Sequence, residues 1–392
     1  MQNIQELDTA ARLGLKLLFI ILNDEGLDAE YHRIIMGQAR INFQKTQSKV
    51  WFSRQKRVPG PLSFLKRPRC HCSCPGDTLR FRQSAKPWKS HAMRTEYRVN
   101  DMTIHRLVEQ ETGFTPMLEF LPNLAKETLE ENLSWLAPGG YNRDTGNVVL
   151  CYQSYVVKTP HHNILVDACI GNDKNFPLRP SWNKKNDSNW MNALTAAGLG
   201  VEDIDFVMCS HLHGDHVGWN TRMENGRWVP TFPKARYLFS KKEYTYWSEI
   251  HQKTPLVQIT DSVLPIIDAN RAELVTSDHE LNDHIRLTPT PGHTPDHFAV
   301  CAGKGGDKAV FTGDLIHSPM QARYPELVMR VDTDRDQGVR TRRAFFERYC
   351  DTDTLCCTMH FPSPSVGYIK RWDKWVQARI SDLTYPSCRT AR

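Results

Sequence analysis

Four residues of metal-binding type stand close together in the segment Ser210-His211-Leu212-His213-Gly214-Asp215-His216. The apolar stretch before it, residues 205–209, is typical of a short buried strand, so the four side chains should lie on the loop that leaves its end. Neutral imidazole and carboxylate are ligands that borderline divalent metals prefer. The pattern H-x-H-x-D-H arises by chance in on the order of one in a thousand chains, which favours a metal site over a polar surface loop.

Three later segments each place one residue of the same kind directly after an apolar stretch. They are Thr290–His297 (TPGHTPDH), Phe311–Asp314 (FTGD) and Thr358–Gly367 (TMHFPSPSVG). A single histidine after a strand is more often a structural residue than a ligand. Together with the first segment, however, His293, Asp314 and His360 complete a set that could hold metal ions.

These loops need a framework of strands and helices that brings them together. Apolar stretches predict strands at 148–158, 163–167, 205–209, 235–239, 285–288, 298–301 and 309–311. Helices are predicted at 188–197, 341–349 and 368–380. Many strands, interspersed helices and metal-type residues at strand ends indicate an α/β fold with two sheets sandwiched between helices.

Composition divides the chain into three zones. Residues 44–94 hold 13 Lys and Arg against one acidic residue, Asp77, and show no apolar periodicity, so we predict a basic, disordered linker rather than a nucleic-acid or membrane arm. Residues 95–392 hold 33 basic and 37 acidic residues, and we assign them to one hydrolase domain. Because phosphate backbones attract the opposite charge, no nucleic-acid partner is expected.

Residues 1–43 have a different pattern, with a predicted helix at 3–13 and a buried strand at 15–22. The stretch QELDTAARLGLKLLFIILND resembles the C-terminal cofactor-binding domain of thiamine-diphosphate enzymes such as acetolactate synthase. In that family a Gly-Asp-Gly segment further upstream supplies part of the metal–diphosphate site. We therefore expect residues 1–43 to be a truncated, non-functional fragment.

Cysteine usage and hydropathy bear on the compartment. The eleven cysteines are scattered and odd in number, which favours a reducing cytoplasm over a disulfide framework. The run Cys70-x-Cys72-x-Cys74 lacks the second pair that a zinc site needs. Residues 13–22 are too short to span a membrane, and acidic residues precede them where a signal peptide would be basic. We expect a cytoplasmic protein without a membrane partner.

Across about residues 100–380 the motifs resemble the metallo-β-lactamase superfamily, which implies an αββα sandwich. The segments GDLIH and HFPSPSVG resemble the branch of that superfamily that contains methyl parathion hydrolase and the N-acyl-homoserine lactonases. The resemblance implies two divalent metal ions, zinc first. It assigns His211, His213 and His293 to one ion, Asp215, His216 and His360 to the other, and Asp314 to a bridge between them.

The implied function is cleavage of a small ester-like substrate by a metal-bound hydroxide. Carboxylic esters, lactones and organophosphate triesters all suit such a site. A zinc-dependent nuclease or phosphodiesterase and a glyoxalase II-like thioester hydrolase remain alternatives. The expected partner is a small-molecule substrate, and the chain could also form a homodimer.

Further roles follow from the same resemblance. Asp215 is the candidate for taking the proton from water, and His317 is the candidate for contacting substrate. Asp167 and Asp205 are either orienting groups for ligands or strand-end caps. The superfamily has glycine where this chain has Asp296, which either orients His293 or is a solvated turn residue. The loops around the site suggest five pocket residues, namely Trp219, Phe176, Trp182, Met320 and Tyr324.

Overall fold

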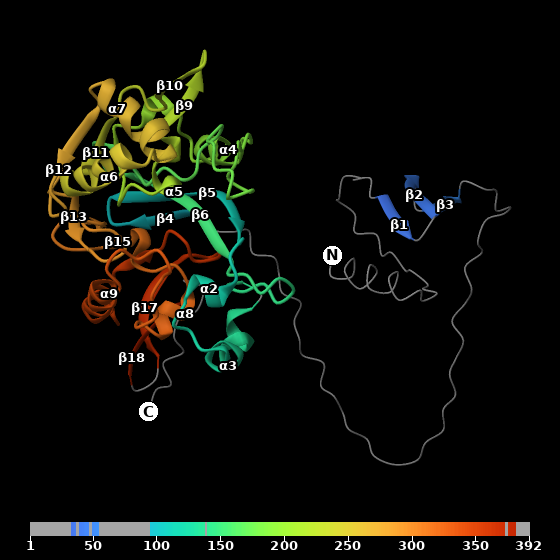
Figure 1. Ribbon diagram of the computed structural model, residues 1–392. Helices are drawn as coiled ribbons and strands as arrows, with labels where there is room; N and C mark the ends of the chain where they lie inside the picture. Colours follow the sequence, from blue (N-terminus) through green and yellow to red (C-terminus); the bar gives the residue numbers. More distant parts are fainter. Residues whose placement is uncertain are drawn as a thin grey trace. The chain divides into compact units, whose positions relative to one another are not determined.

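The computed structural model describes residues 95–137 and 139–371 in full, together with the backbone of strand residues 33–36, 39–46, 49–54, 372 and 375–381. The chain divides into two compact units, residues 1–87 and 88–392. In the first unit, three strands form an antiparallel sheet, namely β1 (Arg33–Met36), β2 (Ala39–Thr46) and β3 (Lys49–Arg54). Figure 1 colours these strands blue.

This small sheet differs from the zones that composition predicted. Strand β2 crosses the boundary that we placed after residue 43, and β3 lies inside the segment predicted to lack regular structure. Strand pairing between neighbouring segments is not visible in local periodicity, which explains the difference. The helix and strand predicted at 3–13 and 15–22 lie outside the described residues, as does the cysteine run at 70–74.

The second unit contains two sheets that carry the predicted strands. The first has seven strands in the order β12 (Ala272–Val275), β11 (Arg236–Ser240), β8 (Phe206–Met208), β7 (Asn163–Val166), β6 (Leu150–Lys158), β5 (Met102–Thr112) and β4 (Glu96–Val99). The second has six strands in the order β13 (Ile285–Pro289), β14 (Phe298–Ala302), β15 (Ala309–Phe311), β16 (Leu355–Cys357), β17 (Val366–Trp372) and β18 (Trp375–Ser381). A separate hairpin joins β9 (Thr221–Glu224) to β10 (Arg227–Pro230).

Alternation along the strands builds the core between the two sheets. On β6, Tyr155 and Val157 point into the cluster shared by both sheets, whereas Val156 packs on the other face. On β14, Phe298 and Val300 enter the same shared cluster from the opposite sheet. Because successive strand residues face opposite sides, both sheets bury two faces and need helices outside.

Helices cover both outer faces, which gives the expected αββα sandwich (Figure 1). The outer face of the first sheet packs against residues of α4 (Asn189–Ala196), α7 (Leu264–Asp268) and the π-helical turn η3 (Ile259–Val263), with α6 (Lys241–Lys253) alongside. The outer face of the second sheet packs against α8 (Pro319–Arg323) and α9 (Arg335–Tyr349). The α9 helix begins after Asp334, whose carboxylate accepts a hydrogen bond from the Gln337 amide at 2.9 Å.

The remaining described helices lie in the connections between strands, and all but α3 (Lys126–Leu136) have at most four residues. They are α2 (Met117–Phe120), α3, α5 (Gly214–Val217) and the 3₁₀ turns η1 (Val201–Asp203), η2 (Gly218–Asn220) and η4 (Gly313–Leu315). None of the described helices is long and apolar enough to cross a membrane. The seven cysteines in the fully described part are all free thiols.

One predicted element is wrong. Residues 368–380 were predicted as a helix, but they form most of the hairpin of β17 and β18. Strand β17 pairs antiparallel with β16, Val366 opposite Cys357, and Ile369 is buried against the outer helices. An apolar residue every three or four positions fits either structure, and here pairing with an existing sheet edge decided the outcome.

Candidate metal centre

The metal-type residues all lie on loops that follow strands of the two sheets. His211 and His213 follow β8, Asp215 and His216 lie in α5, and the other three follow β13, β15 and β16, namely His293, Asp314 and His360. Strand β7 runs parallel to β8, and β15 runs parallel to β16. The carboxyl ends of parallel strands meet at one edge of a sheet, which brings these distant segments together.

Three histidines surround one oxygen of Asp314. The Oδ2 atom of Asp314 lies 3.2 Å from Nε2 of His293 and 3.6 Å from Nε2 of His211. Nδ1 of His213 lies 3.0 Å from the same nitrogen of His211 and 3.1 Å from that of His293. These four side chains can offer ligand atoms to one point.

A second group surrounds the other oxygen of Asp314. Its Oδ1 atom lies 2.9 Å from Nε2 of His360 and 3.0 Å from Nε2 of His216, and these two nitrogens are 3.2 Å apart. Asp215 completes the group, with Oδ2 at 3.7 Å from His360 and 3.9 Å from His216. Asp314 therefore stands between two sets of ligand atoms, one facing each of its oxygens.

The arrangement fits metal ions better than a hydrogen-bond network. The buried Oδ1 atom of Asp314 receives no hydrogen bond of acceptable geometry, although two imidazole nitrogens lie within 3.0 Å of it. Unpaired buried polar atoms are rare in folded proteins and call for an explanation. The ligands of a metal ion must direct their donor atoms at one common point, and the imidazole nitrogens here converge in this way.

The histidines of the cluster differ in how easily they are protonated. Burial holds the pKa values of His211 and His213 well below the usual value, so both rings are neutral. Burial opposes protonation of His216 and His293 too, but the charge of Asp314 and its hydrogen bond to His293 outweigh it. The pKa of His216 is raised well above the usual value and that of His293 to about 9. An ion must therefore displace protons from these two rings.

Hydrogen bonds to the nitrogens that face away from Asp314 orient the rings of two candidate ligands, His216 and His360. Asp167 Oδ2 lies 2.9 Å from Nδ1 of His216, and both Asp167 oxygens accept from Ser210, next to His211. Nδ1 of His360 donates to the Cys151 carbonyl at 3.0 Å. The orienting role considered for Asp167 thus agrees with its contacts. Such bonds fix the tautomer and direction of a ligating imidazole.

Asp332 was missed by the sequence analysis. Its Oδ1 atom lies 2.8 Å from Nδ1 of His293, and its Oδ2 atom accepts from the Met329 amide. Asp332 stands in no motif, and its only local signal is its place just before the Asp334 cap of α9. His297 was also missed, and its Nε2 accepts a hydrogen bond from the Asp314 amide at 2.8 Å.

Two other carboxylates have structural contacts. Asp296 was expected either to orient His293 or to be a solvated turn residue, and it does neither. Its carboxylate is buried and accepts hydrogen bonds from Ser240 and Ser277. Asp205 accepts from the Asn163 amide at 2.8 Å, which is the strand-end role.

His317 lies inside the cluster. Its Nε2 atom is 3.0 Å from Oδ2 of Asp314, and its ring stacks on that of His360 with centroids 5.4 Å apart. The imidazole is buried, and its Nδ1 atom has no hydrogen-bond partner. These contacts suit a residue that orients Asp314, and they leave one nitrogen free for a further partner.

The five residues predicted to line a substrate pocket differ in their burial. Trp219 is buried in the core behind the ligand motif, stacked on Trp190 with its indole N–H on Glu109, so it cannot line a pocket. Met320 and Trp182 are buried in the cluster around α2 and α3. Phe176 and Tyr324 are partly exposed beside that cluster and remain candidates. A large aromatic residue next to a motif is more often core than pocket wall, and burial decided these cases.

Phe176 has the clearest link to the site. A Cβ atom on Gly214, inside the ligand motif, would lie 2.7 Å from the end of the Phe176 ring. The Phe176 ring also contacts Trp182 edge to face at 5.6 Å. On the other flank, the ring of Trp247 from α6 lies 5.2 Å from that of His213. Trp247 was not singled out from the sequence.

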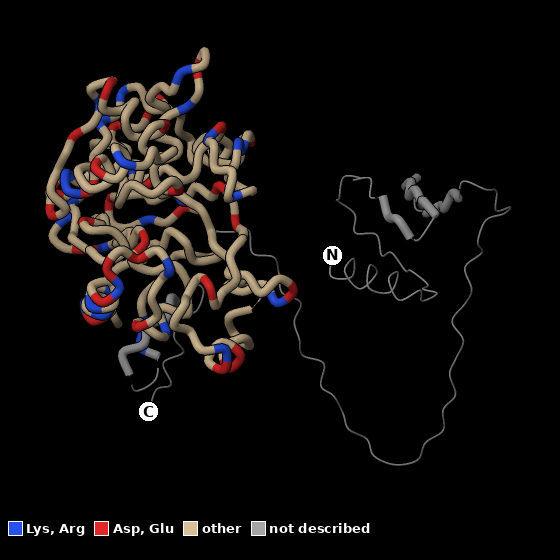
Figure 2. Tube along the Cα trace, in the orientation of Figure 1, with Lys and Arg blue, Asp and Glu red and all other residues tan. Residues whose placement is uncertain are grey.

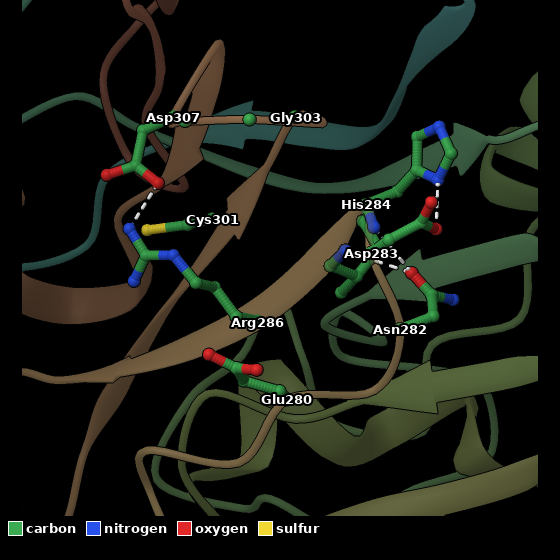
Figure 3. A pocket seen from close by; sticks show the side chains of 11 residues that line it. Glu280, Asn282, Asp283, His284, Arg286, Cys301, Gly303 and Asp307 are labelled. Carbon is green, nitrogen blue, oxygen red and sulfur yellow. Dashed lines mark hydrogen bonds and ion pairs between the residues drawn. The ribbon is translucent and has the colours of Figure 1, made fainter.

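The described surface includes the following two hollows. One, of about 360 Å³, is lined by residues of the loops near α2 and by Leu178 and Arg179. The other, of about 170 Å³, lies beside β13 and β14 and contains none of the candidate ligands (Figure 3). Acidic and basic residues are intermixed over the described fold, as Figure 2 shows.

Comparisons of the sequence with known proteins find one superfamily. The sequence profile of the metallo-β-lactamase superfamily matches residues 152–360. An N-acyl homoserine lactonase of a Bacillus species is 28% identical over 107 residues, which are 27% of this chain and 36% of that protein. The N-acyl homoserine lactonase AiiA of Bacillus thuringiensis subsp. kurstaki is 24% identical over an equally long stretch. The chain thus matches only about a third of these relatives' length.

Solved structures match over a longer range. The hydrolase AbOPH of the β-lactamase superfamily has a TM-score of 0.61 and 23% identity, over 74% of this chain and 97% of that chain. The dizinc quorum-quenching lactonase AidC has a TM-score of 0.60 and 21% identity, over 74% and 98%. Both likenesses show the fold alone.

The resemblance of residues 1–43 to thiamine-diphosphate enzymes finds no support in these comparisons, and a short apolar helix–strand pattern is too common to carry it. The superfamily profile, by contrast, covers more than half of the chain and ends on the candidate ligand His360. With the αββα sandwich and the His/Asp cluster at its strand ends, this match shows that the chain belongs to the metallo-β-lactamase superfamily.

Proposed function

We propose that the protein is a hydrolase that cleaves a small ester-like substrate with the help of two divalent ions, zinc first. The observation that carries this proposal is Asp314, whose two oxygens each face a different set of ligand atoms within 3.6 Å. A carboxylate between two such sets is suited to bridging two ions. We assign His211, His213 and His293 to one ion, and Asp215, His216 and His360 to the other.

Two ions bound there would lower the pKa of a water molecule and polarise the group under attack. The protein's own residues would do the rest. Asp215 is the least buried of the cluster's carboxylates, with 12% of its side chain exposed, and its Oδ atoms can take the proton released from water. His317 would hold Asp314 in place through Nε2, and its free Nδ1 is the candidate contact to substrate.

The substrate class is a proposal that rests on residue chemistry and on the partial matches. The assigned residues include no serine, threonine or cysteine nucleophile, which suits direct attack by water on a carbonyl or phosphoryl centre. Two curated relatives are N-acyl homoserine lactonases, so we place lactones and carboxylic esters first and organophosphate triesters next. The seven free thiols suit the reducing cytoplasm, which we propose as the location.

Metal analysis together with a substrate panel tests this function. Purified protein dialysed against zinc should hold two ions per chain. It should hydrolyse members of a panel of p-nitrophenyl esters, N-acyl-homoserine lactones, methyl parathion and a thioester. The variant Asp314→Ala should bind less zinc and lose about a hundred-fold or more of the turnover. Asp205→Asn, which alters a strand-end cap, is the matched control and should keep both properties.

Two outcomes would contradict the proposal. Full turnover in Asp314→Ala would show that the carboxylate does not join two ions. Cleavage of single-stranded RNA or DNA, with no turnover of any panel member, would favour the nuclease alternative.

A further inference from the structure

Arg179 is an arginine whose charge has no acidic partner in the fully described part of the chain. The carbon of its guanidinium lies 4.0 Å above the centre of the Trp182 ring and 5.6 Å from that of Phe114. These two rings meet edge to face, with centroids 5.9 Å apart. The aromatic faces hold the guanidinium plane through cation–π contact but cannot satisfy its N–H groups, which point outward at the edge of the plane.

The guanidinium lines the hollow of about 360 Å³ near α2. The wall of this hollow combines apolar and charged groups. Phe114 is exposed and Leu178 is 92% exposed, whereas Arg330 lies 4.0 Å from Glu119, a carboxylate in the same wall. One unpaired positive charge therefore faces a space of the size that small ligands occupy, beside an apolar rim.

Two aromatic rings in succession connect the Arg179 guanidinium with the metal centre. Trp182 contacts Tyr152 edge to face at 5.4 Å, and Tyr152 contacts the candidate ligand His360 at 5.5 Å. On its other side Trp182 contacts Phe176, which lies against Gly214 of the ligand motif. Arg179 is therefore close to the candidate ligands, and a molecule held by it would have to pass beside these rings to reach the cluster.

We propose that Arg179 anchors an anionic group of the substrate, a carboxylate at the end remote from the bond that is cleaved. This inference rests on the proposed function and narrows its substrate class to esters that carry a negative charge. A guanidinium is weakly hydrated and offers paired N–H donors that match a carboxylate. Leu178 and Phe114 would cover the apolar chain between the carboxylate and the ester.

A purely structural role is the alternative, in which stacking on Trp182 only holds the 176–182 loop in place. Long arginine side chains often stabilise a protein through such packing. The two roles differ in what a charge-neutral replacement does. Loss of packing would affect every substrate alike, whereas loss of an anchor would affect only substrates that carry the anion.

Two esters that differ in one charge give the first test. Mono-p-nitrophenyl glutarate carries a free carboxylate, and its methyl ester does not. With zinc-loaded protein, Arg179→Gln should raise KM for the charged ester about ten-fold and change kinetics on the neutral one less than two-fold. Arg179→Lys should recover part of the preference. Arg330→Gln removes an arginine that is already paired in the same wall, and its effect on the charged ester should be small.

Binding without turnover gives the second test. Metal-free protein, with its fold checked by circular dichroism, is titrated with 4-phenylbutyrate and with 4-phenylbutanamide, and tryptophan fluorescence reports binding. Removing zinc matters because carboxylates also bind the ions. The acid should bind more tightly than the amide, and Arg179→Gln should abolish the difference.

The outcomes separate this inference from the function on which it rests. Zinc-dependent ester hydrolysis with equal effects of Arg179→Gln on both esters would overturn the anchor and leave the hydrolase. Charge-selective binding that depends on Arg179, with no ester cleaved, would support the anchor and overturn the hydrolase. Equal binding of acid and amide by metal-free protein would overturn the anchor.

Discussion

Oδ1 of Asp332 lies 2.8 Å from Nδ1 of His293, a candidate ligand 39 residues earlier in the chain. The carboxylate holds the imidazole so that Nε2 turns toward Asp314. Asp332 is itself fixed, because its other oxygen accepts the Met329 amide at 2.8 Å. Thr333 Oγ1 also donates to the His293 carbonyl at 3.0 Å, so the segment before α9 locks the loop that carries this ligand.

The first prediction tests this contact. Asp332→Asn keeps the shape of the side chain but removes the charge that orients and activates His293. Zinc affinity, measured by competition with a chromogenic chelator, should fall about 10- to 100-fold. The control is Asp296→Asn, which lies three residues from His293 in sequence but bonds Ser240 and Ser277. If the Asp296 variant loses more affinity than the Asp332 variant, our assignment of the orienting carboxylate is wrong.

The second prediction concerns pH and the junction of the two sheets. His284, just before β13, lies 2.9 Å from Asp101 in the turn between β4 and β5, and 2.8 Å from Asp283. Figure 3 shows the contact to Asp283. The hydrogen bond to Asp101 raises the pKa of His284 most, burial opposes it, and Asp283 adds to the rise.

A raised folded-state pKa means that the protonated ring stabilises the fold. This contribution is complete below the unfolded value of about 6.5 and is lost as pH rises through the higher folded value. His284→Gln should therefore cost more unfolding free energy at pH 6 than at pH 9, as urea denaturation can measure. The exposed His161, changed to Gln, should cost little at either pH. An equal or larger cost for His284→Gln at pH 9 would exclude this linkage.

The third prediction concerns the close approach of two backbones behind the ligand motif. A Cβ atom on Gly218 would lie 1.8 Å from the carbonyl oxygen of Ile170. The neighbouring Trp219 amide donates to the Ala168 carbonyl at 2.7 Å, so neither backbone can move away without losing this pairing. Gly218→Ala should cost more than about 4 kcal/mol of unfolding free energy or prevent folding.

Gly198 is the matched control for this substitution. It has φ +73°, and a Cβ atom there meets nothing within 4 Å. Gly198→Ala should cost only about 1–2 kcal/mol, because an L-residue pays a local penalty at positive φ. Urea denaturation of both variants gives the comparison, and similar costs at the two sites would show that the contact with Ile170 can relax.

The fourth prediction concerns the N-terminal quarter. All assigned ligands lie between His211 and His360, and contacts divide the chain after residue 87. A chain that begins at Met93 should therefore fold, bind zinc and turn over like the full chain. In the full chain, trypsin should cut early at basic residues of the segment predicted to be a disordered linker, such as Arg57, Arg67 and Arg82. Insoluble or inactive protein from the shorter chain would show that residues 1–92 support the catalytic part.

The sequence by itself determined the type and order of the residues that converge. In His211-x-His213-x-Asp215-His216 the candidate ligands are neighbours in the chain, and an apolar strand before a polar loop is a local pattern. His293, Asp314 and His360 follow the same rule, each on a loop after a strand. An α/β fold with two sheets between helices could be predicted for this reason, because strand alternation and loop chemistry appear in consecutive residues. The superfamily itself was predicted from the resemblance of these motifs to a known family.

Tertiary structure alone decided which side chains meet across the chain. No local sequence pattern indicates that Asp332 contacts His293, or that the Arg179 guanidinium lies against the rings of Trp182 and Phe114. Trp219 follows the ligand motif in sequence yet is buried in the core, while Trp247 of α6 lies beside His213. Residues 368–380 became a hairpin because β16 offered an edge to pair with. The burial of a side chain and the pairing of a strand depend on segments that are distant in sequence. A local pattern does not predict how those segments pack.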